Sequence, residues 1–526
     1  MQASAPAGTT VQVVQAADDR AAPAGPALAP EPLMARFQFK EGRGLRQQTA
    51  RGTIVNAAFQ VGLSALGLIK GFVVAALLTA SDYGIWGILV IAMGTLLWLR
   101  QVGVGDKYIQ QSESDQELAF QKAFTLELLV CGIFTALLVL AVPVIALVYG
   151  HQELLVPGFL LTLMVPLMAF QSPLWIFYRR MDFVRQRSLQ AVDPIVGFVV
   201  TLGLALAGAG YWSLVIGVVA GSLAGAVVAV TASPYRLALR YDRGTLRSYS
   251  SFSWPLFVAA AASLVIAQGS VLAGELATGL AGVGAIALAA TIVQFNERVD
   301  GIITGTMYPA ICAVRDRAEL LYEAFVKSNR LALMWGIPFG VALALFAGDL
   351  VAFGIGEEWR PALLLLQIFG INAALYHIGF NWDAFYRAAG NTRPMAVVSV
   401  VTMLGFLAAP VPLIFTNGLD GFAVGMAIAT VVTLVARTVY LVKLFPAFDM
   451  ARHAARAIAP TLPALGLVLL LRLVGDLDRT LALALAELAL FVGVTAAATF
   501  VFERSLLREV IGYLRRVPSS PQAAAT

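Results

Sequence analysis

The chain has 526 residues, of which 59% are hydrophobic and only 13% are charged. Its mean hydropathy of +0.81 excludes a soluble globular domain and is typical of a polytopic membrane protein. The net charge of +5 does not indicate nucleic-acid binding, because the basic residues are dispersed over short connections between apolar runs.

The beginning of the chain differs in composition from everything after it. Residues 1–46 are rich in Ala, Pro, Gly and Gln, which predicts a disordered cytoplasmic tail. Basic residues then crowd the approach to the first apolar run, where they either bind anionic headgroups or act only as a topology signal. They are Arg36, Lys40, Arg43, Arg46 and Arg51.

Two apolar runs, 53–79 and 83–104, open the membrane part of the chain. Each reaches the roughly 20 residues that a helix needs to cross a bilayer, and the Ser81–Asp82 turn between them predicts a helical hairpin. Lys70 lies well inside the first run and Arg100 near the inner end of the second. A cation in hydrocarbon costs about 2.5–3.5 kcal/mol, so we expect both to face protein or a water-filled cavity.

Further apolar runs follow, and the sequence predicts an all-α polytopic membrane protein with about 14 transmembrane helices. A β-barrel is excluded, because its strands would alternate polar and apolar residues. The further runs lie at 121–148, 155–178, 191–208, 211–231, 250–274, 281–303, 331–355, 360–386, 395–415, 419–442, 457–474 and 480–501.

The basic residues predict the orientation in the membrane, because Lys and Arg concentrate on alternate connections. The other connections are very short and hold Arg360 and Arg479. We therefore expect a multi-pass membrane protein with both termini in the cytoplasm. The basic side holds Arg179, Arg180, Arg185, Arg187, Arg236, Arg240, Arg243, Arg247, Arg315, Arg317, Lys327, Arg330, Arg387, Arg393, Arg452, Arg456, Arg504, Arg508, Arg515 and Arg516.

A long basic connection at 233–249 divides the chain, and its alternation of Arg with apolar residues predicts an amphipathic interfacial helix. The division gives an N-terminal six-helix bundle at 47–232 and a C-terminal six-helix bundle at 250–445. Two extra transmembrane helices at 446–503 and a cytoplasmic tail at 504–526 complete the predicted order.

The two predicted bundles match in their pattern of spans. An ungapped offset of 200 residues places Tyr83–Gly84 on Val283–Gly284 and the run 53–79 on the run 253–279. A unit with an even number of spans repeats in parallel, about an axis along the membrane normal. The binding site is then expected between the two halves.

Three cations are the strongest site candidates. Arg298 falls in the second half close to the place that Arg100 takes in the first. If the halves face each other, Lys70, Arg100 and Arg298 converge on one cleft, which suits a phosphate or pyrophosphate group. In the alternative, both arginines reach the headgroups, and Lys70 lies in a buried pair or at the outer interface.

Two acidic residues are further candidates for a cavity or coupling role. Glu127 lies near the cytoplasmic end of its run and is either a proton or sodium site or a partner of nearby Lys122. Glu297 is the neighbour of Arg298 but points about 100° away from it on a helix, so the two need not pair.

Polar residues inside later runs complete the candidates. His377 and Asn381 are four residues apart, so they share a helix face that either lines a cavity or makes a helix–helix contact. Arg437 lies deeper than a headgroup contact allows and is a cavity candidate. Glu487 is expected to face lipid or to pair with another residue.

The sequence shows no signature of catalysis or of a cofactor. Cys131 and Cys312 both lie at or in apolar runs, which makes a disulfide framework unexpected, and no metal-ligand spacing is present. A P-loop, GxSxG and HExxH are absent, so we expect neither an enzyme nor an ATP-driven pump.

Short motifs in order along the chain resemble oligosaccharide flippases of the polysaccharide-transport (Wzx-type) family. They are Ser81-Asp82-Tyr83-Gly84, the stretch RQVGVGDKYIQQ at 100–111, Tyr308-Pro309, the stretch GEEW at 356–359 and the stretch RAAGNTR at 387–393. The resemblance covers about residues 50–445 and places the chain in the multidrug/oligosaccharidyl-lipid/polysaccharide exporter superfamily.

This resemblance implies two six-helix bundles in a V-shaped arrangement. It also implies translocation of polyprenyl-pyrophosphate-linked oligosaccharides for exopolysaccharide, capsule or O-antigen synthesis. Membrane lipids, a polysaccharide polymerase and glycosyltransferases are the implied partners. Two alternatives stay open at this point: a cation-coupled exporter of drugs or small metabolites on the same fold, and a non-transporting scaffold of a glycan-assembly complex. A cationic cleft disfavours cationic drugs.

Overall fold

The computed structural model describes residues 45–78, 80–100, 102–149, 151–474 and 478–515, and the regular structure in these ranges is helical. The disordered tail predicted over 1–46 lies outside them, apart from Leu45 and Arg46, which begin α1. The prediction of an all-α fold is confirmed.

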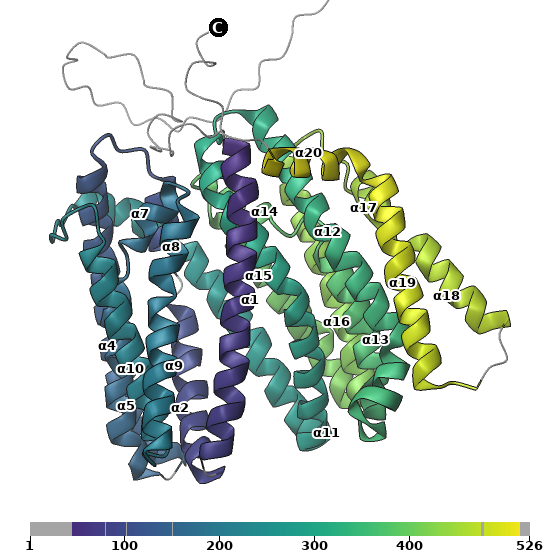
Figure 1. Ribbon diagram of the computed structural model, residues 1–526, viewed down its shortest axis with the longest axis horizontal. Coiled ribbons are helices and arrows are strands. Elements are labelled where there is room, and N and C mark those ends of the chain that lie inside the picture. Colours follow the sequence, from purple (N-terminus) through teal and green to yellow (C-terminus); the bar gives the residue numbers. More distant parts are fainter. Residues whose placement is uncertain (1–44, 79, 101, 150, 475–477, 516–526) are drawn as a thin grey trace, which may run out of the picture.

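The helices form two groups that stand side by side (Figure 1). Helix α1 (Leu45–Leu77) lies where the groups meet and contacts both α9 and α11. The first group consists of α2 (Ala80–Leu99), α3 (Val104–Gln110), α4 (Gln116–Tyr149), α5 (Leu155–Thr162), α6 (Met164–Phe170), α7 (Leu174–Arg179), α8 (Phe183–Gln190), α9 (Val192–Leu206) and α10 (Trp212–Thr231).

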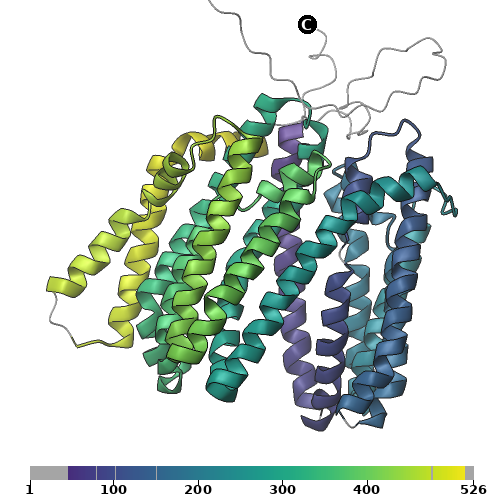
Figure 2. The ribbon, with the colours of Figure 1, turned by 180° about the vertical axis from the view of Figure 1, so that it is seen from behind.

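The second group begins with the long element α11 and also carries the C-terminal helices on its outer side (Figure 2). Its members are α11 (Arg243–Ala313), α12 (Ala318–Asp349), α13 (Leu363–Tyr376), α14 (Trp382–Ala388), α15 (Arg393–Ala408), α16 (Pro410–Leu444), α17 (Met450–Ile458), α18 (Leu462–Val474), α19 (Leu481–Phe502) and α20 (Arg504–Arg515).

Two of these elements are helical hairpins rather than single helices. A straight helix of 71 residues would be about 107 Å long, far more than a bilayer is thick, and α11 instead turns back at Gly279. Gly279 has φ 70° and Gly418, inside α16, has φ 60°. Both angles favour glycine, which has no Cβ to clash in this region.

Eight helices in the described ranges are long and apolar enough to cross a membrane, or nine if the bent pair Met450–Ile458 and Leu462–Val474 is one span. This confirms a polytopic membrane protein, whereas the count of fourteen stays a prediction. The run predicted at 360–386 shows one reason for the difference. It is divided into a 3-10 turn at Glu357–Ala362, the 14-residue α13 and the short α14.

The prediction of an interfacial helix over 233–249 is wrong for most of that segment, because α11 begins at Arg243 and residues 233–242 are not helical. Side chains of α4 explain the difference by bonding the backbone of this segment. Gln121 donates to the carbonyl of Arg236 at 3.2 Å, and Thr125 accepts from the amide of Arg240 at 2.7 Å. These bonds hold the connection against α4 without a helix.

The first hairpin turns slightly earlier than the sequence predicts. Helix α1 ends at Leu77 and α2 begins at Ala80, so Ser81 and Asp82 form the first turn of α2 rather than the connection. The carboxylate of Asp82 accepts a hydrogen bond from the amide of Tyr211 at 3.1 Å. Asp82 thereby fixes the start of α2 to the start of α10.

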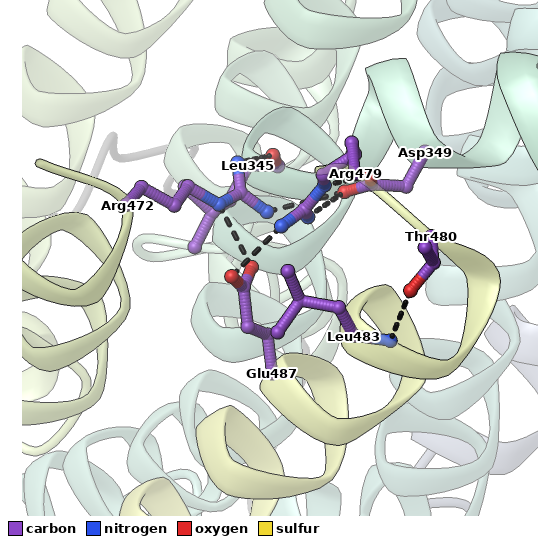
Figure 3. A network of polar contacts seen from close by, with 7 residues as sticks. All are labelled: Leu345, Asp349, Arg472, Arg479, Thr480, Leu483 and Glu487. Carbon is purple, nitrogen blue, oxygen red and sulfur yellow. Dashed lines mark hydrogen bonds and ion pairs between the residues drawn. The ribbon is translucent and has the colours of Figure 1, made fainter. Parts of the chain in front are cut away.

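The C-terminal helices are fastened to α12 by a network of four charged residues (Figure 3). Arg479 contacts Asp349 at 2.6 Å and Glu487 at 2.7 Å, and Arg472 contacts the same two carboxylates at 3.1 Å and 2.9 Å. Hydrogen bonds to Asp349 and Glu487 hold the pKa of Arg479 above its usual value. The pairing role expected for Glu487 is therefore confirmed.

The region predicted as a cytoplasmic tail at 504–526 begins with a helix. Residues Arg504–Arg515 form α20. Lys327 of α12 contacts Glu509 at 2.6 Å, and Arg330 pairs with Glu503 just before α20. These pairs and the contact of α20 with α1 explain why the segment folds back onto the helices.

The predicted orientation has a direct test. Arg243 begins the first arm of α11, whereas Gly418, at the turn of α16, lies next to Thr278 at the far end of that arm. Reporter fusions ending at these two residues are expected to report opposite sides of the membrane, with Arg243 in the cytoplasm. A fusion at Asp449 is the control and should agree with Arg243. The same side for Arg243 and Gly418 would contradict the predicted topology.

Candidate functional site

Helices α7, α14 and α17 lie at one end of the molecule (Figure 1), and α3 contacts both α7 and α14 there. Basic connections border these short helices. We call this end the basic end and define it by Arg180, Arg236, Arg315, Arg387 and Arg452.

The two helical groups share one hydrophobic core at the basic end. Tyr108 and Phe120 of the first group and Tyr308, Phe325 and Phe385 of the second are all almost fully buried in it. Because this core includes side chains of both groups, the groups are joined firmly here.

Polar contacts cross between the groups at the same place. Arg387 pairs with Asp106 and lies over the ring of Tyr308, 5.1 Å from its centroid. The Tyr308 hydroxyl donates to the carbonyl of Asp106 at 3.2 Å, and Arg315 donates to the carbonyl of Gln110 at 2.6 Å. We call this set, formed by Asp106, Gln110, Tyr308, Arg315 and Arg387, the basic-end junction.

Below the junction, α1 and the second arm of α11 run antiparallel and form the seam between the groups. Asn56 donates to the Thr306 hydroxyl at 2.6 Å, and Arg298 donates to the Ser64 hydroxyl at 3.1 Å. Asn56 and Ser64 are eight residues apart on α1, and their partners Thr306 and Arg298 are eight residues apart on α11. The two antiparallel helices therefore advance in step, and six residues further along, Lys70 lies at about the level of Ile292.

Beyond this seam the two groups splay apart. In both ribbon views, α1 and α11 lie farther from each other at their turns than at the basic end (Figures 1 and 2). The described hydrogen bonds that join the groups lie at the junction and along the seam as far as Ser64. The conformation is thus closed at the basic end.

Arg100 does not join the other two cations, because it is paired inside the first group. Its guanidinium contacts Glu127 at 2.6 Å and the thiol of Cys131 at 3.1 Å. The pairing of Glu127 with Lys122 that the sequence left open is not formed. Lys122 instead contacts Glu113 at 2.9 Å, since this acid lies nearer the basic end.

Lys70 is half-buried about two turns before the end of α1, and the charge of Asp193 acts on it. Asp193 stands at the start of α9 and accepts a hydrogen bond from Gln171 at 3.1 Å. Sequence reasoning missed Asp193, although an acid directly before Pro194 at the edge of an apolar run was a usable signal.

Glu297 and Arg298 are both exposed on the second arm of α11. Arg298 reaches α1 through Ser64, so it lies at the seam between the groups. Two of the three predicted cations, Lys70 and Arg298, therefore belong to the helices that form the seam.

His377 and Asn381 do not share a helix face, contrary to the prediction, because the chain bends between α13 and α14. Gly379 has φ 69° in this bend. Asn381 donates to the Ser328 hydroxyl of α12, whereas His377 contacts Asp300 of α11 at 3.0 Å.

Arg437, predicted as a cavity residue, fills the space beside this bend. It is 3% exposed, and its guanidinium donates to the carbonyls of Tyr376 and Ile378, the latter at 3.0 Å. It thus satisfies carbonyls that the broken helix leaves without their usual partners.

A long apolar groove of about 810 Å³ lies between α12 and α19. It extends from Asp349 and Leu481, at one end of these helices, to Thr499 and Leu507 near the basic end. Ile292, which lies at about the level of Lys70, also lines it. The 22 residues of α19 span about 33 Å, so the groove follows most of the membrane thickness.

The described residues hold no group of three or more His, Cys, Asp or Glu side chains that could bind a metal ion. Both cysteines are free and buried.

Solved MATE transporters share this fold. One described as MATE in the bent conformation aligns with a TM-score of 0.66 and 14% identity, covering 79% of this chain and 100% of its own. An outward-facing multidrug resistance MATE transporter of the MOP superfamily aligns with a TM-score of 0.65 and 14% identity, covering 80% of this chain and 99% of its own. A Vibrio cholerae MATE transporter aligns with a TM-score of 0.64 and 13% identity, covering 77% and 98%.

The fold class is therefore that of MATE transporters. No curated protein matches the sequence. The profile of a family described as polysaccharide biosynthesis protein matches residues 73–364, which is more than half of the chain. The protein belongs to this family, as the motifs in its sequence predict.

Proposed function

We propose that the protein translocates polyprenyl-pyrophosphate-linked oligosaccharides across the bacterial inner membrane for polysaccharide synthesis. The observation that carries this proposal is the apolar groove between α12 and α19, which adjoins the helix that bears Arg298. An exporter of small polar metabolites has no need of such a surface. A substrate with a long hydrocarbon tail does, since the tail must stay in an apolar environment while the headgroup crosses.

The headgroup of such a substrate needs a different environment. A pyrophosphate in hydrocarbon without compensating charge is strongly disfavoured, and fixed cations lower that barrier. Arg298 supplies a cation at the seam, and Lys70 supplies one further along α1, where the groups begin to splay apart. A guanidinium suits bidentate contacts with phosphate oxygens. Arg100 is compensated by Glu127, so we assign the pyrophosphate to Lys70 and Arg298.

Transport then requires the basic end to open. With both termini in the cytoplasm, the basic end faces the cytoplasm, where the lipid-linked unit is taken up. Breaking the basic-end junction and rocking the two groups about the seam gives alternating access. The polymerase and glycosyltransferases that the resemblance implies would supply and consume the substrate on the two sides.

The groove provides a test that separates a lipid-linked substrate from a drug. Leu485 and Val492 line the groove and are 55% and 57% exposed. Replacing both with Gln makes the groove polar, and we expect at least a fivefold loss of surface polysaccharide with build-up of the precursor in the cytoplasmic leaflet, as about 1 kcal/mol of lost tail binding predicts. The control is Leu469→Gln with Leu470→Gln on α18, which are similarly exposed but do not line the groove. Normal polysaccharide with increased drug sensitivity would favour the drug exporter instead.

A further inference from the structure

A buried acid and a buried histidine meet inside the second group, away from the seam. His377 is 0% exposed and Asp300 is 8% exposed. Nε2 of His377 lies 3.0 Å from Oδ2 of Asp300. Asp300 belongs to the second arm of α11, and His377 stands at the bend after α13. The contact therefore joins two elements that the chain brings together from distant positions.

The partner of Nδ1, the other ring nitrogen of His377, determines whether a proton must lie between Nε2 and Asp300. Nδ1 of His377 lies 2.6 Å from the carbonyl oxygen of Ala373. A carbonyl oxygen can only accept, so Nδ1 must carry a hydrogen. Nε2 and the carboxylate of Asp300 then need a second proton between them, on one atom or the other. Without it, a lone pair of the neutral ring would face a negative oxygen at 3.0 Å.

The neighbouring charged groups Arg437 and Asp383 are engaged with other partners, so they do not replace the proton shared by Asp300 and His377. Arg437 on α16 and Asp383 on α14 both act on Asp300. However, Arg437 is bonded to the carbonyls of the bend, and Asp383 contacts Arg387 at 3.2 Å. Of the groups around the pair, the remaining acid is Glu297, one helical turn before Asp300 on the same arm.

Glu297 offers a route for the proton to leave the buried site. Its side chain is exposed on α11, whereas Asp300 is buried, and residues three apart on a helix are neighbours. An ionisable group on a membrane helix is costly to expose to lipid, so we expect Glu297 to face water. From there it can exchange protons and pass them to the buried carboxylate one turn away. The order of transfer is thus solvent, Glu297, Asp300 and His377.

The same arm of α11 makes the contacts that close the basic end. Thr306 and Arg298 bond α1, and the Tyr178 hydroxyl donates to the carbonyl of Gly305. All three lie within two turns of Asp300. Loss of the shared proton makes the contact of Asp300 with His377 repulsive, which favours movement of this arm away from the bend after α13.

We propose that Asp300 and His377 form a proton-binding site, with Glu297 as its exchange group, whose occupancy stabilises the conformation closed at the basic end. This deepens the proposed function, on which its role in transport rests, by naming protons as the coupling ions. A proton shifts the equilibrium only because it binds the two conformations with different affinity.

Distance measurements between spin labels test the site without any substrate. Labels at Ser188→Cys on α8 and Ala318→Cys on α12 place one probe on each group near the basic end, and both positions are exposed. The native cysteines are 0% exposed and stay in place. In the full chain in lipid nanodiscs, we expect the short-distance population at about pH 5 to fall at least twofold by about pH 8, the range in which histidine usually titrates.

The expected result for Asp300→Asn and for His377→Gln, each in the labelled protein, is a distance distribution that no longer changes with pH. Glu297→Gln should keep the equilibrium change but slow it after a pH jump. The control is Glu323→Gln, which removes a surface partner of Lys327 and should leave the pH dependence intact.

Two independent variants, Asp300→Asn and His377→Gln, are used in case one of them does not fold. Each must elute as a single species in size-exclusion chromatography before its distances are measured. A pH-dependent shift that persists in both Asp300→Asn and His377→Gln overturns the proton site, as does a wild-type distribution that is independent of pH. Neither outcome affects the proposed flippase activity, which is tested separately by surface polysaccharide. Conversely, normal polysaccharide in groove variants would leave the proton site standing.

Discussion

Replacing Lys70 or Arg298 with Gln is expected to reduce surface polysaccharide at least tenfold in a deletion strain that carries the variant at normal protein level. A hydrogen bond from a charged group contributes about 1.5–3 kcal/mol, and each 1.4 kcal/mol corresponds to a factor of ten. Both residues lie on the helices that form the seam, Lys70 half-buried in α1 and Arg298 on α11. Without either cation, the pyrophosphate would meet a larger barrier at the seam.

Charge rather than shape should decide this result. Lys70→Arg is expected to keep partial export, because it keeps the cation. Arg360→Gln is the matched control: its side chain is 72% exposed and pairs with Glu357 at the opposite end of the second group. Full export by both neutral variants would rule out the electrostatic role of Lys70 and Arg298, while a loss caused by Arg360→Gln would show that any lost arginine impairs the protein.

Hydropathy and short motifs predicted the features of this protein that depend on local sequence. Runs of apolar residues identified an all-helical polytopic membrane protein, because each membrane segment must satisfy its own backbone within lipid. The short motifs identified the family, and Lys70 and Arg298 were placed on the helices that meet at the seam. These features could be predicted from local sequence because they do not depend on which distant segment packs beside them.

Features that depend on distant partners could not be predicted in this way. The absence of a helix at residues 233–242 is explained by side chains of α4, more than a hundred residues earlier in the chain, which bond the backbone of this segment. Glu127 is only five residues from Lys122 in sequence, yet it pairs with Arg100 at the end of α2. In each case local spacing offered one partner and the tertiary structure supplied another.

The bend at His377 shows the same limit for the candidate site. A spacing of four residues placed His377 and Asn381 on one face only on the assumption of an unbroken helix. Gly379 between them was the available signal for a break. Once the helix is broken, its carbonyls need other donors, and Arg437 is buried for that reason rather than to line a cavity.

Arg437→Met is therefore expected to destabilise the protein by roughly 2–6 kcal/mol, because it leaves the carbonyls of Tyr376 and Ile378 unpaired at about 1–3 kcal/mol each. The measurement is the midpoint of thermal unfolding of the purified protein in detergent, which should fall by several degrees. Arg437→Lys should recover part of the loss, since an ammonium can still donate but lacks the planar fork of the guanidinium. Arg508→Met is the control, because Arg508 is exposed on α20 and its loss should leave the midpoint unchanged. An unchanged midpoint for Arg437→Met would show that the bend holds its shape without this arginine.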